Sequence, residues 1–161
     1  MKEYTINIFN TNFICLTNSG NGGALSISND YSNLYTVSSI FNYCYLPYSS
    51  QTQGGAIYFS SKYGHFEGSK LCASHCAAYL RSFIYCLSTY ESKEKTTFKL
   101  SSYHCCANSS SLGNYGIVEF KSDKAESSDV NATCNTVYHY VVIGFDTKSS
   151  SFSSFSIYEN N

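Results

Sequence analysis

With 161 residues the chain is long enough for one domain with a sizeable core, and its net charge of −1 provides no basic surface for nucleic acid or anionic membranes. Charged residues make up only 13%, while 16 tyrosines and 11 phenylalanines favour strands, so we expect an all-β protein. The sequence contains no apolar stretch long enough to span a bilayer, and residues 1–13 lack the apolar segment of a signal peptide. Two hypotheses fit: an intracellular protein, or a piece of a longer protein whose targeting segment lies elsewhere.

The first two expected strand segments repeat each other. Residues 8–28 and 40–60 align without a gap at an offset of 32, which matches Ile8 to Ile40 and Phe9 to Phe41. Weaker copies follow, such as residues 103–106 against 41–44 at an offset of 62 and residues 76–87 against 134–145 at 58. A repeated segment with a variable period is typical of a chain that winds into stacked strands.

Five strand segments are expected from these copies. They begin near Ala24, Ala56, Phe83, Ile117 and Val141. We therefore expect a right-handed parallel β-helix, a solenoid of about five coils, over residues 1–161 as a single domain and as a fragment of a longer solenoid. In this fold Leu25 pairs beside Ile57, and Ile57 beside Ile84, with parallel strands in register.

A column of cysteine and asparagine accompanies the strands. Its members are Asn12, Cys44, Cys76, Cys106, Cys134 and Asn160, which lie 32, 32, 30, 28 and 26 residues apart. We expect them to stack inside the coil, because asparagine stacks through its amide and free cysteine packs as a small apolar residue. Disulfides are the less favoured alternative: stacked cysteines approach bridging distance, but their side chains point the same way and not at each other.

Glycines mark the expected sharp turns of the coil. The pairs Gly22–Gly23 and Gly54–Gly55 precede the first two strands, and Gly116 holds the equivalent place in a later copy. A sharp turn needs a positive φ or a close backbone approach, and glycine supplies both at low cost.

The repeated motifs resemble a known family. GGA followed by Leu or Ile at residues 22–25 and 54–57, with FNTN at 9–12 and FNYC at 41–44, is similar to the repeat of chlamydial polymorphic membrane proteins and of trichomonad surface-protein families. The resemblance covers residues 8–60 best. It implies a β-helix displayed at a cell surface or outside the cell, with an adhesive role, although this chain shows neither a signal peptide nor an anchor.

The residues that could carry chemistry do not form a recognisable catalytic site. Acidic residues are scattered, and Glu119 points outward from its strand without a carboxylate at the neighbouring positions Tyr58 and Tyr85. A zinc site built from residues 72–76 and 104–106 stays a minor alternative, because its spacing matches no standard zinc motif. We therefore expect no catalytic residue, no cofactor and no metal.

The sequence thus favours a non-catalytic structural or adhesive module. Its expected partners are surface proteins or glycans, and its ends are expected to associate with one another. Asn108 and Asn131 begin N-x-S/T sequences and would accept glycans if the protein is secreted. The alternative is a carbohydrate-active β-helix enzyme, such as a polysaccharide lyase or a glycoside hydrolase. A third possibility is a gene fragment without a separate role.

Overall fold

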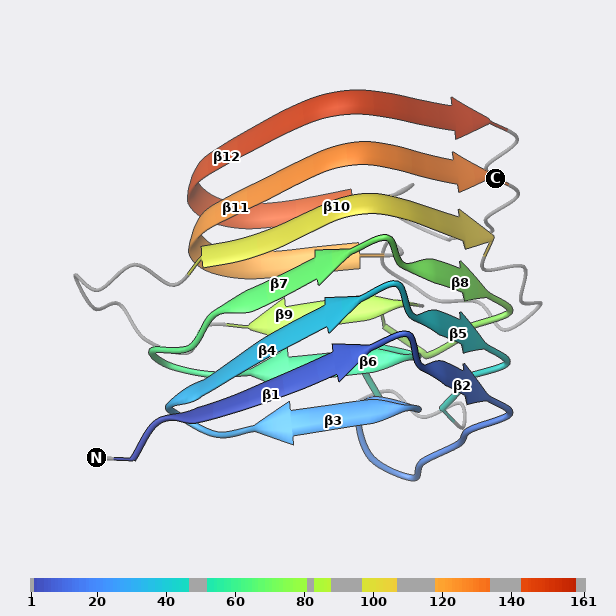
Figure 1. Cartoon of the computed structure of the whole chain (residues 1–161), viewed down its shortest axis with the longest axis horizontal. Coiled ribbons are helices and arrows are strands. Elements are labelled where there is room, and N and C mark those ends of the chain that lie inside the picture. Colours follow the sequence, from blue (N-terminus) through green and yellow to red (C-terminus); the bar gives the residue numbers. More distant parts are fainter. Residues whose placement is uncertain are drawn as a thin grey trace.

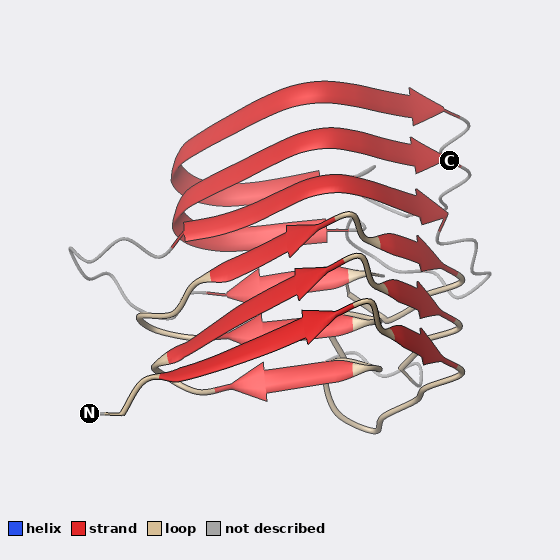
Figure 2. Ribbon diagram, in the orientation of Figure 1, coloured by secondary structure: helices blue, strands red, loops and turns tan. Residues whose placement is uncertain are grey.

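The computed structural model describes residues 2–46, 52–80, 83–87, 97–106, 118–133 and 143–158. Within these residues the fold is all-β, and Figure 2 shows strands joined by loops without a helix. The strands are β1 (Tyr4–Phe9), β2 (Asn12–Ile14), β3 (Leu25–Ser28), β4 (Ser32–Val37), β5 (Ile40–Asn42), β6 (Ile57–Ser60), β7 (Phe66–Ser69), β8 (Cys72–Ser74), β9 (Ile84–Leu87), β10 (Thr97–Cys106), β11 (Val118–Thr133) and β12 (Ile143–Tyr158). The described part of the chain therefore contains no helix that could cross a membrane.

The strands pair in parallel and form three stacks, which can be followed in Figure 1. The first stack contains β1, β4 and β7, the second contains β2, β5 and β8, and the third contains β3, β6 and β9. The long strand β10 continues the first two stacks, because its first half pairs with β7 and its second half with β8. Strands β11 and β12 are long enough to extend all three stacks.

The predicted pairing in the third stack is confirmed. Leu25 lies beside Ile57 and Ile57 beside Ile84, in parallel strands, and the same column continues to Val118 and Ile143. All five predicted segments therefore contribute a strand to this stack.

One alignment used in the prediction is displaced by a single residue. The offset of 58 matches Ile84 to position 142, whereas the strands place Ile84 in the column of Val118 and Ile143. A shift of one residue would turn every side chain of a strand to the opposite face of the sheet. The observed register instead puts Phe145 beside Phe120, which is fully buried.

The predicted offset of 32 is wrong for the first two stacks, which begin at an offset of 28. Phe9 pairs with Val37 instead of Phe41, and Phe13 takes the place beside Phe41. The reason lies in the core: the rings of Phe13 and Phe41 stack with centroids 4.9 Å apart and planes inclined by 8°. Phe9, in contrast, is 56% exposed. The matching FNTN and FNYC letters therefore do not mark equivalent positions.

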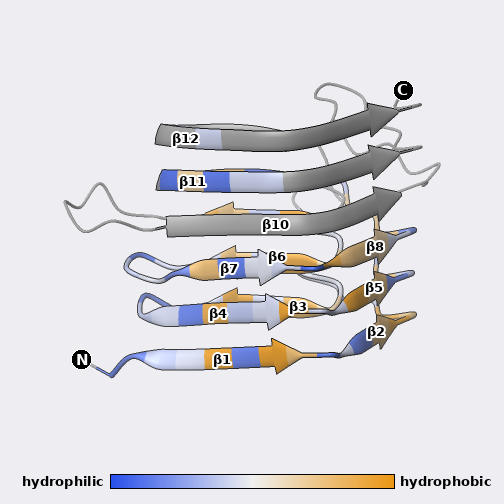
Figure 3. Ribbon diagram, turned by 45° about the horizontal axis from the view of Figure 1, so that its top comes forward, coloured by the Kyte–Doolittle hydropathy of each residue, from blue (hydrophilic) through white to orange (hydrophobic). Residues whose placement is uncertain are grey.

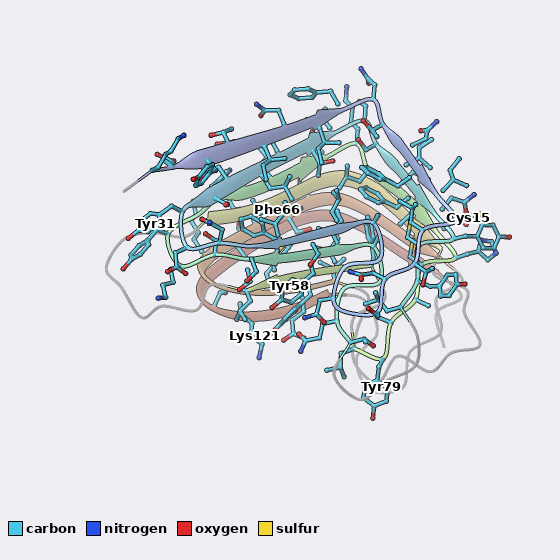
Figure 4. All side chains as sticks on the ribbon, turned by 90° about the horizontal axis from the view of Figure 1, so that it is seen from below. Cys15, Tyr31, Tyr58, Phe66, Tyr79 and Lys121 are labelled. Carbon is cyan, nitrogen blue, oxygen red and sulfur yellow. The ribbon has the colours of Figure 1, made fainter. Side chains whose placement is uncertain are left out.

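All three stacks contribute side chains to the core, and its largest members are phenylalanines. Phe66 of β7 faces Phe59 of β6 at 6.0 Å and Phe120 of β11 at 6.2 Å between ring centroids, and Figure 4 shows Phe66 pointing into the interior. Each fully buried side chain of this size contributes about 1.5–3 kcal/mol through removal from water. Figure 3 shows hydrophobic positions recurring at equivalent places in β2, β5 and β8, as in-register pairing requires.

Two corners of the chain use left-handed backbone in residues other than glycine. The φ angles lie between 51° and 54° at Asn10, Ser38, Lys70, Cys15, Tyr43 and His75. The first three form the corner between the first and second stacks, and the last three follow the second stack. A left-handed residue turns the chain sharply, at a cost that the surrounding pairing must offset.

The structure describes both glycine pairs that precede the first two strands of the third stack. Gly22 and Gly54 have φ angles of 68° and 67°. A Cβ atom at Gly23 would lie 2.2 Å from the carbonyl oxygen of Gly55, so the two backbones approach too closely for any side chain. Gly116 lies outside the described residues.

Candidate functional site

Two members of the predicted cysteine column occupy equivalent positions in adjacent strand connections. Cys44 and Cys76 are fully buried and unbridged, and they directly precede Tyr45 and Ala77, which form a parallel bridge. Each thiol donates to a carbonyl oxygen of the preceding segment at 3.5 Å: Cys44 to Phe13 and Cys76 to Phe41. The same contact is therefore made twice, once in each connection.

The other members of the column do not share this position or cannot be placed. Asn12 pairs with Ile40 because the register there is 28 residues, and it is exposed. Cys106 pairs with Ser74, two residues before Cys76. Cys134 and Asn160 lie outside the described residues. The predicted column is therefore wrong at Asn12 and Cys106.

One strand pairing bears on the zinc hypothesis. His104 of β10 pairs in register with Cys72 of β8. Among the residues whose side chains the structure describes, no group of three or more histidine, cysteine or acidic residues is placed to hold a metal ion. Register alone does not make a zinc site, which needs four ligands in tetrahedral arrangement.

The two glycosylation candidates differ in what the structure describes. Asn131 belongs to β11, where its backbone pairs with His104 on one side and Ser156 on the other. Asn108 lies outside the described residues. The role of both residues as glycan acceptors thus stays a prediction.

A charged face on the first stack was missed in the sequence. Glu67 of β7 and Glu126 of β11 belong to one register column, with Lys99 between them. The Nε2 atom of His65 lies 3.5 Å from Oε2 of Glu67, and Lys124 forms an ion pair with Glu126. An offset of 59 residues separates the two glutamates. Aligning the sequence with itself at an offset of 59, and not only around the GGA motif, would have matched Glu67 with Glu126.

The third stack carries a smaller polar face. Tyr58, Tyr85 and Glu119 follow one another in a single column, and the two tyrosine rings lie 5.9 Å apart. Glu119 forms an ion pair of 3.4 Å with Lys121 on the same strand. Figure 4 shows Tyr58 and Lys121 pointing away from the interior. Tyr85, however, is only 5% exposed, so little of the pair is open to a ligand.

Among the side chains that the structure describes, most of the exposed large apolar ones lie on the second stack and its flanking corner. We call it the apolar corner; it consists of Ile14, Leu16, Ile40, Tyr43 and Tyr45, each 37–55% exposed. Tyr43 is ordered by a neighbour, because its ring stacks on His75 at 4.5 Å. His75 in turn bonds through Nδ1 to the Ser74 hydroxyl at 2.7 Å. Aromatic and aliphatic side chains held this way on a rigid sheet are typical of a contact surface for another molecule.

The sequence matches no family model, and neither curated proteins nor solved structures give a match.

Proposed function

We propose that the chain is a right-handed parallel β-helix of about five coils that serves as a non-catalytic structural and adhesive module. Parallel in-register pairing along three stacks supports the architecture, since winding a chain through three stacks in turn produces such a pairing pattern. The repeat resemblance supports display at a cell surface or outside the cell. The adhesive role rests on the apolar corner.

The partner that fits the apolar corner best is a protein surface. Tyrosine and isoleucine at 42–55% exposure supply contact area without a charge that would need a partner. The left-handed backbone at Tyr43 and the stacked His75 ring fix this part of the corner before binding, which reduces the entropy lost on association.

A binding assay with a triple variant tests this proposal. The full chain is offered to immobilised collagen, fibronectin and mucin, and to an array of oligosaccharides. Ile14→Ser, Tyr43→Ser and Tyr45→Ser combined should weaken protein binding at least tenfold, because central apolar and aromatic contacts dominate interface energies. Glu67→Gln combined with Glu126→Gln on the charged face is the matched control and should bind as the wild type does.

Three outcomes would contradict the proposal. Equal binding by the triple variant would remove the apolar corner from the contact. Binding to oligosaccharides alone would replace the protein partner by a glycan. No binding to any of the immobilised proteins or sugars would overturn the adhesive role.

The second candidate function is a carbohydrate-active enzyme, and the charged face favours it. The backbones at Glu67 and Glu126 are separated by two strand spacings, about 9.6 Å, just above the upper limit of about 9.5 Å between the carboxylates of inverting glycosidases. However, Glu67 lies beside His65 and Glu126 beside Lys124, an arrangement typical of surface ion pairs. Release of reducing sugar from a polysaccharide panel, abolished by Glu67→Gln, would establish the enzyme over the scaffold.

A further inference from the structure

The backbones that carry Cys44 and Cys76 are paired directly. The amide of Ala77 donates to the carbonyl oxygen of Cys44 at 3.1 Å, and the amide of Leu46 donates to that of Ala77 at 2.9 Å. Residues in register in adjacent parallel strands lie about 4.8 Å apart, within the range of about 4.4–6.8 Å between the Cα atoms of disulfides. The Cα separation expected for this register therefore lies within the disulfide range.

The two sulfur atoms interact in the reduced protein. The Cys76 thiol lies within hydrogen-bonding reach of the Cys44 sulfur and lowers the pKa of the Cys44 thiol, while burial opposes this shift. A thiolate is the reactive form of cysteine towards oxidants. The lowered pKa of Cys44 favours the reactive form of this thiol.

Among the cysteines whose side chains are described, no other two share this arrangement. Cys86 is equally buried, but its column neighbours are Phe59 and Phe120, and burial raises the pKa of its thiol well above the ordinary value. Burial also raises the pKa of Cys72, which pairs with Ile40. Cys86 thus provides a matched control: a buried thiol without a thiol neighbour.

We propose that Cys44 and Cys76 form a reversible dithiol–disulfide couple, oxidised by hydrogen peroxide, that fastens the second stack between β5 and β8. The Cys44 thiolate attacks one peroxide oxygen, so that an S–O bond forms, the O–O bond breaks, and hydroxide leaves and takes up a proton as water. The Cys76 thiolate then attacks the Cys44 sulfur, and an S–S bond replaces the S–O bond. The oxygen leaves as hydroxide, which takes up the second thiol proton. Two thiols are oxidised and one peroxide is reduced to two waters.

The burial of both thiols determines which oxidant can act. Both cysteines are fully buried, so the oxidant must be small and uncharged to reach them during brief openings of the chain. A bulky disulfide such as oxidised glutathione requires a much larger opening. We therefore expect hydrogen peroxide to form the bond at least tenfold faster than oxidised glutathione at equal concentration.

Mass spectrometry of the full chain tests the proposal. The reduced protein is treated with hydrogen peroxide, remaining thiols are alkylated in denaturant, and non-reduced peptides are sequenced. We expect a cross-linked peptide pair joining Cys44 to Cys76, lighter by two hydrogen atoms, that dithiothreitol separates. Cys86→Ser should form the same link, whereas Cys44→Ser should leave Cys76 alkylatable.

The proposal is overturned if both thiols stay alkylatable in the folded, peroxide-treated wild type, or if Cys44 links mainly to another cysteine. A folding failure of Cys44→Ser does not affect this decision, because the wild type and Cys86→Ser carry it. The same oxidation in denaturing urea should give mixed pairings, since the native register is then lost. An identical Cys44–Cys76 yield in urea would also count against the proposal.

Discussion

Replacing Phe41 by alanine is the most direct test of the register in the core. Phe41 is fully buried, and its ring lies 4.9 Å from that of Phe13 and 5.6 Å from that of Phe83. Removing a phenylalanine that is enclosed in this way costs about 3–5 kcal/mol of unfolding free energy. Phe13 belongs to the outermost strand of its stack and is covered from one side, so Phe13→Ala should cost about half as much, roughly 1.5–2.5 kcal/mol. Phe9→Ala, at a 56% exposed site, should change stability by less than about 1 kcal/mol.

A double-mutant cycle then separates the two possible registers. Phe13 and Phe41 should couple by about 0.5–1.5 kcal/mol, the range for stacked aromatic pairs, whereas Phe9 and Phe41 should be additive within about 0.3–0.5 kcal/mol. Urea unfolding followed by circular dichroism supplies the free energies, with an unchanged m-value as the check that the denatured states are comparable. Coupling of Phe41 to Phe9 but not to Phe13 would refute the offset of 28 and restore the offset of 32.

Four further predictions follow from local features of the structure. Gly54→Ala should lower the free energy of unfolding in urea by more than about 2 kcal/mol, because φ is 67° and the new Cβ would lie 2.2 Å from a backbone oxygen. The control Gly20→Ala should lower it by less than about 1 kcal/mol, because the nearest atom to its new Cβ lies 3.9 Å away. Cys76→Asp should prevent folding by burying a charge, whereas Cys76→Ala should cost about 1–2 kcal/mol; equal effects would place the site at the surface. Burial raises the pKa of Cys86 above its ordinary value of 9.0, so the thiol ionises in the unfolded chain before it ionises in the folded one. The contribution of the neutral thiol to the free energy of unfolding is therefore complete below pH 9, and above pH 9 it falls by up to about 1.4 kcal/mol per pH unit. Cys86→Ala should reduce this loss of stability when urea unfolding is measured at pH 8 and pH 10. The core-facing side chains of β1 and β3 are only half-buried, so the chain should associate through the sheet edges that these two strands form. Ile8→Lys should shift the mass measured by light scattering towards that of the monomer. A wild type that is monomeric at high concentration would contradict this prediction.

The third stack could be predicted from sequence because its strands carry a clear signal. The GGA motif fixes the corner before β3 and β6, and apolar residues alternate after it, so Leu25 and Ile57 align without ambiguity. In the first two stacks the sequence similarity was misleading. Both Phe9 and Phe13 can be aligned with Phe41 in the sequence, and only the packing of the rings in the core shows that Phe13 is its partner.

The charged face could not be found from local patterns. Glu67 and Glu126 come together through two successive pairings, with β10 between their strands, so an error in either offset separates them. The apolar corner was equally hidden, since Ile14 and Ile40 look like core residues in the sequence. Their exposure follows from the short strands β2 and β5, in which Phe13 and Phe41 take the inward positions.

The connections between the stacks differ in how much length they allow. Two residues always separate the first stack from the second, after Phe9, Val37 and Ser69, and one of each pair is the left-handed residue that turns the corner. Between the second and third stacks, in contrast, the chain takes ten residues after Ile14 and fourteen after Asn42. The connections from the third stack back to the first also vary, with three residues after Ser28, five after Ser60 and nine after Leu87. Inserted segments are therefore absorbed at these two sets of connections and not at the corner between the first and second stacks. Related sequences can diversify at these connections, or a peptide can be grafted there, while the two-residue corner stays uniform.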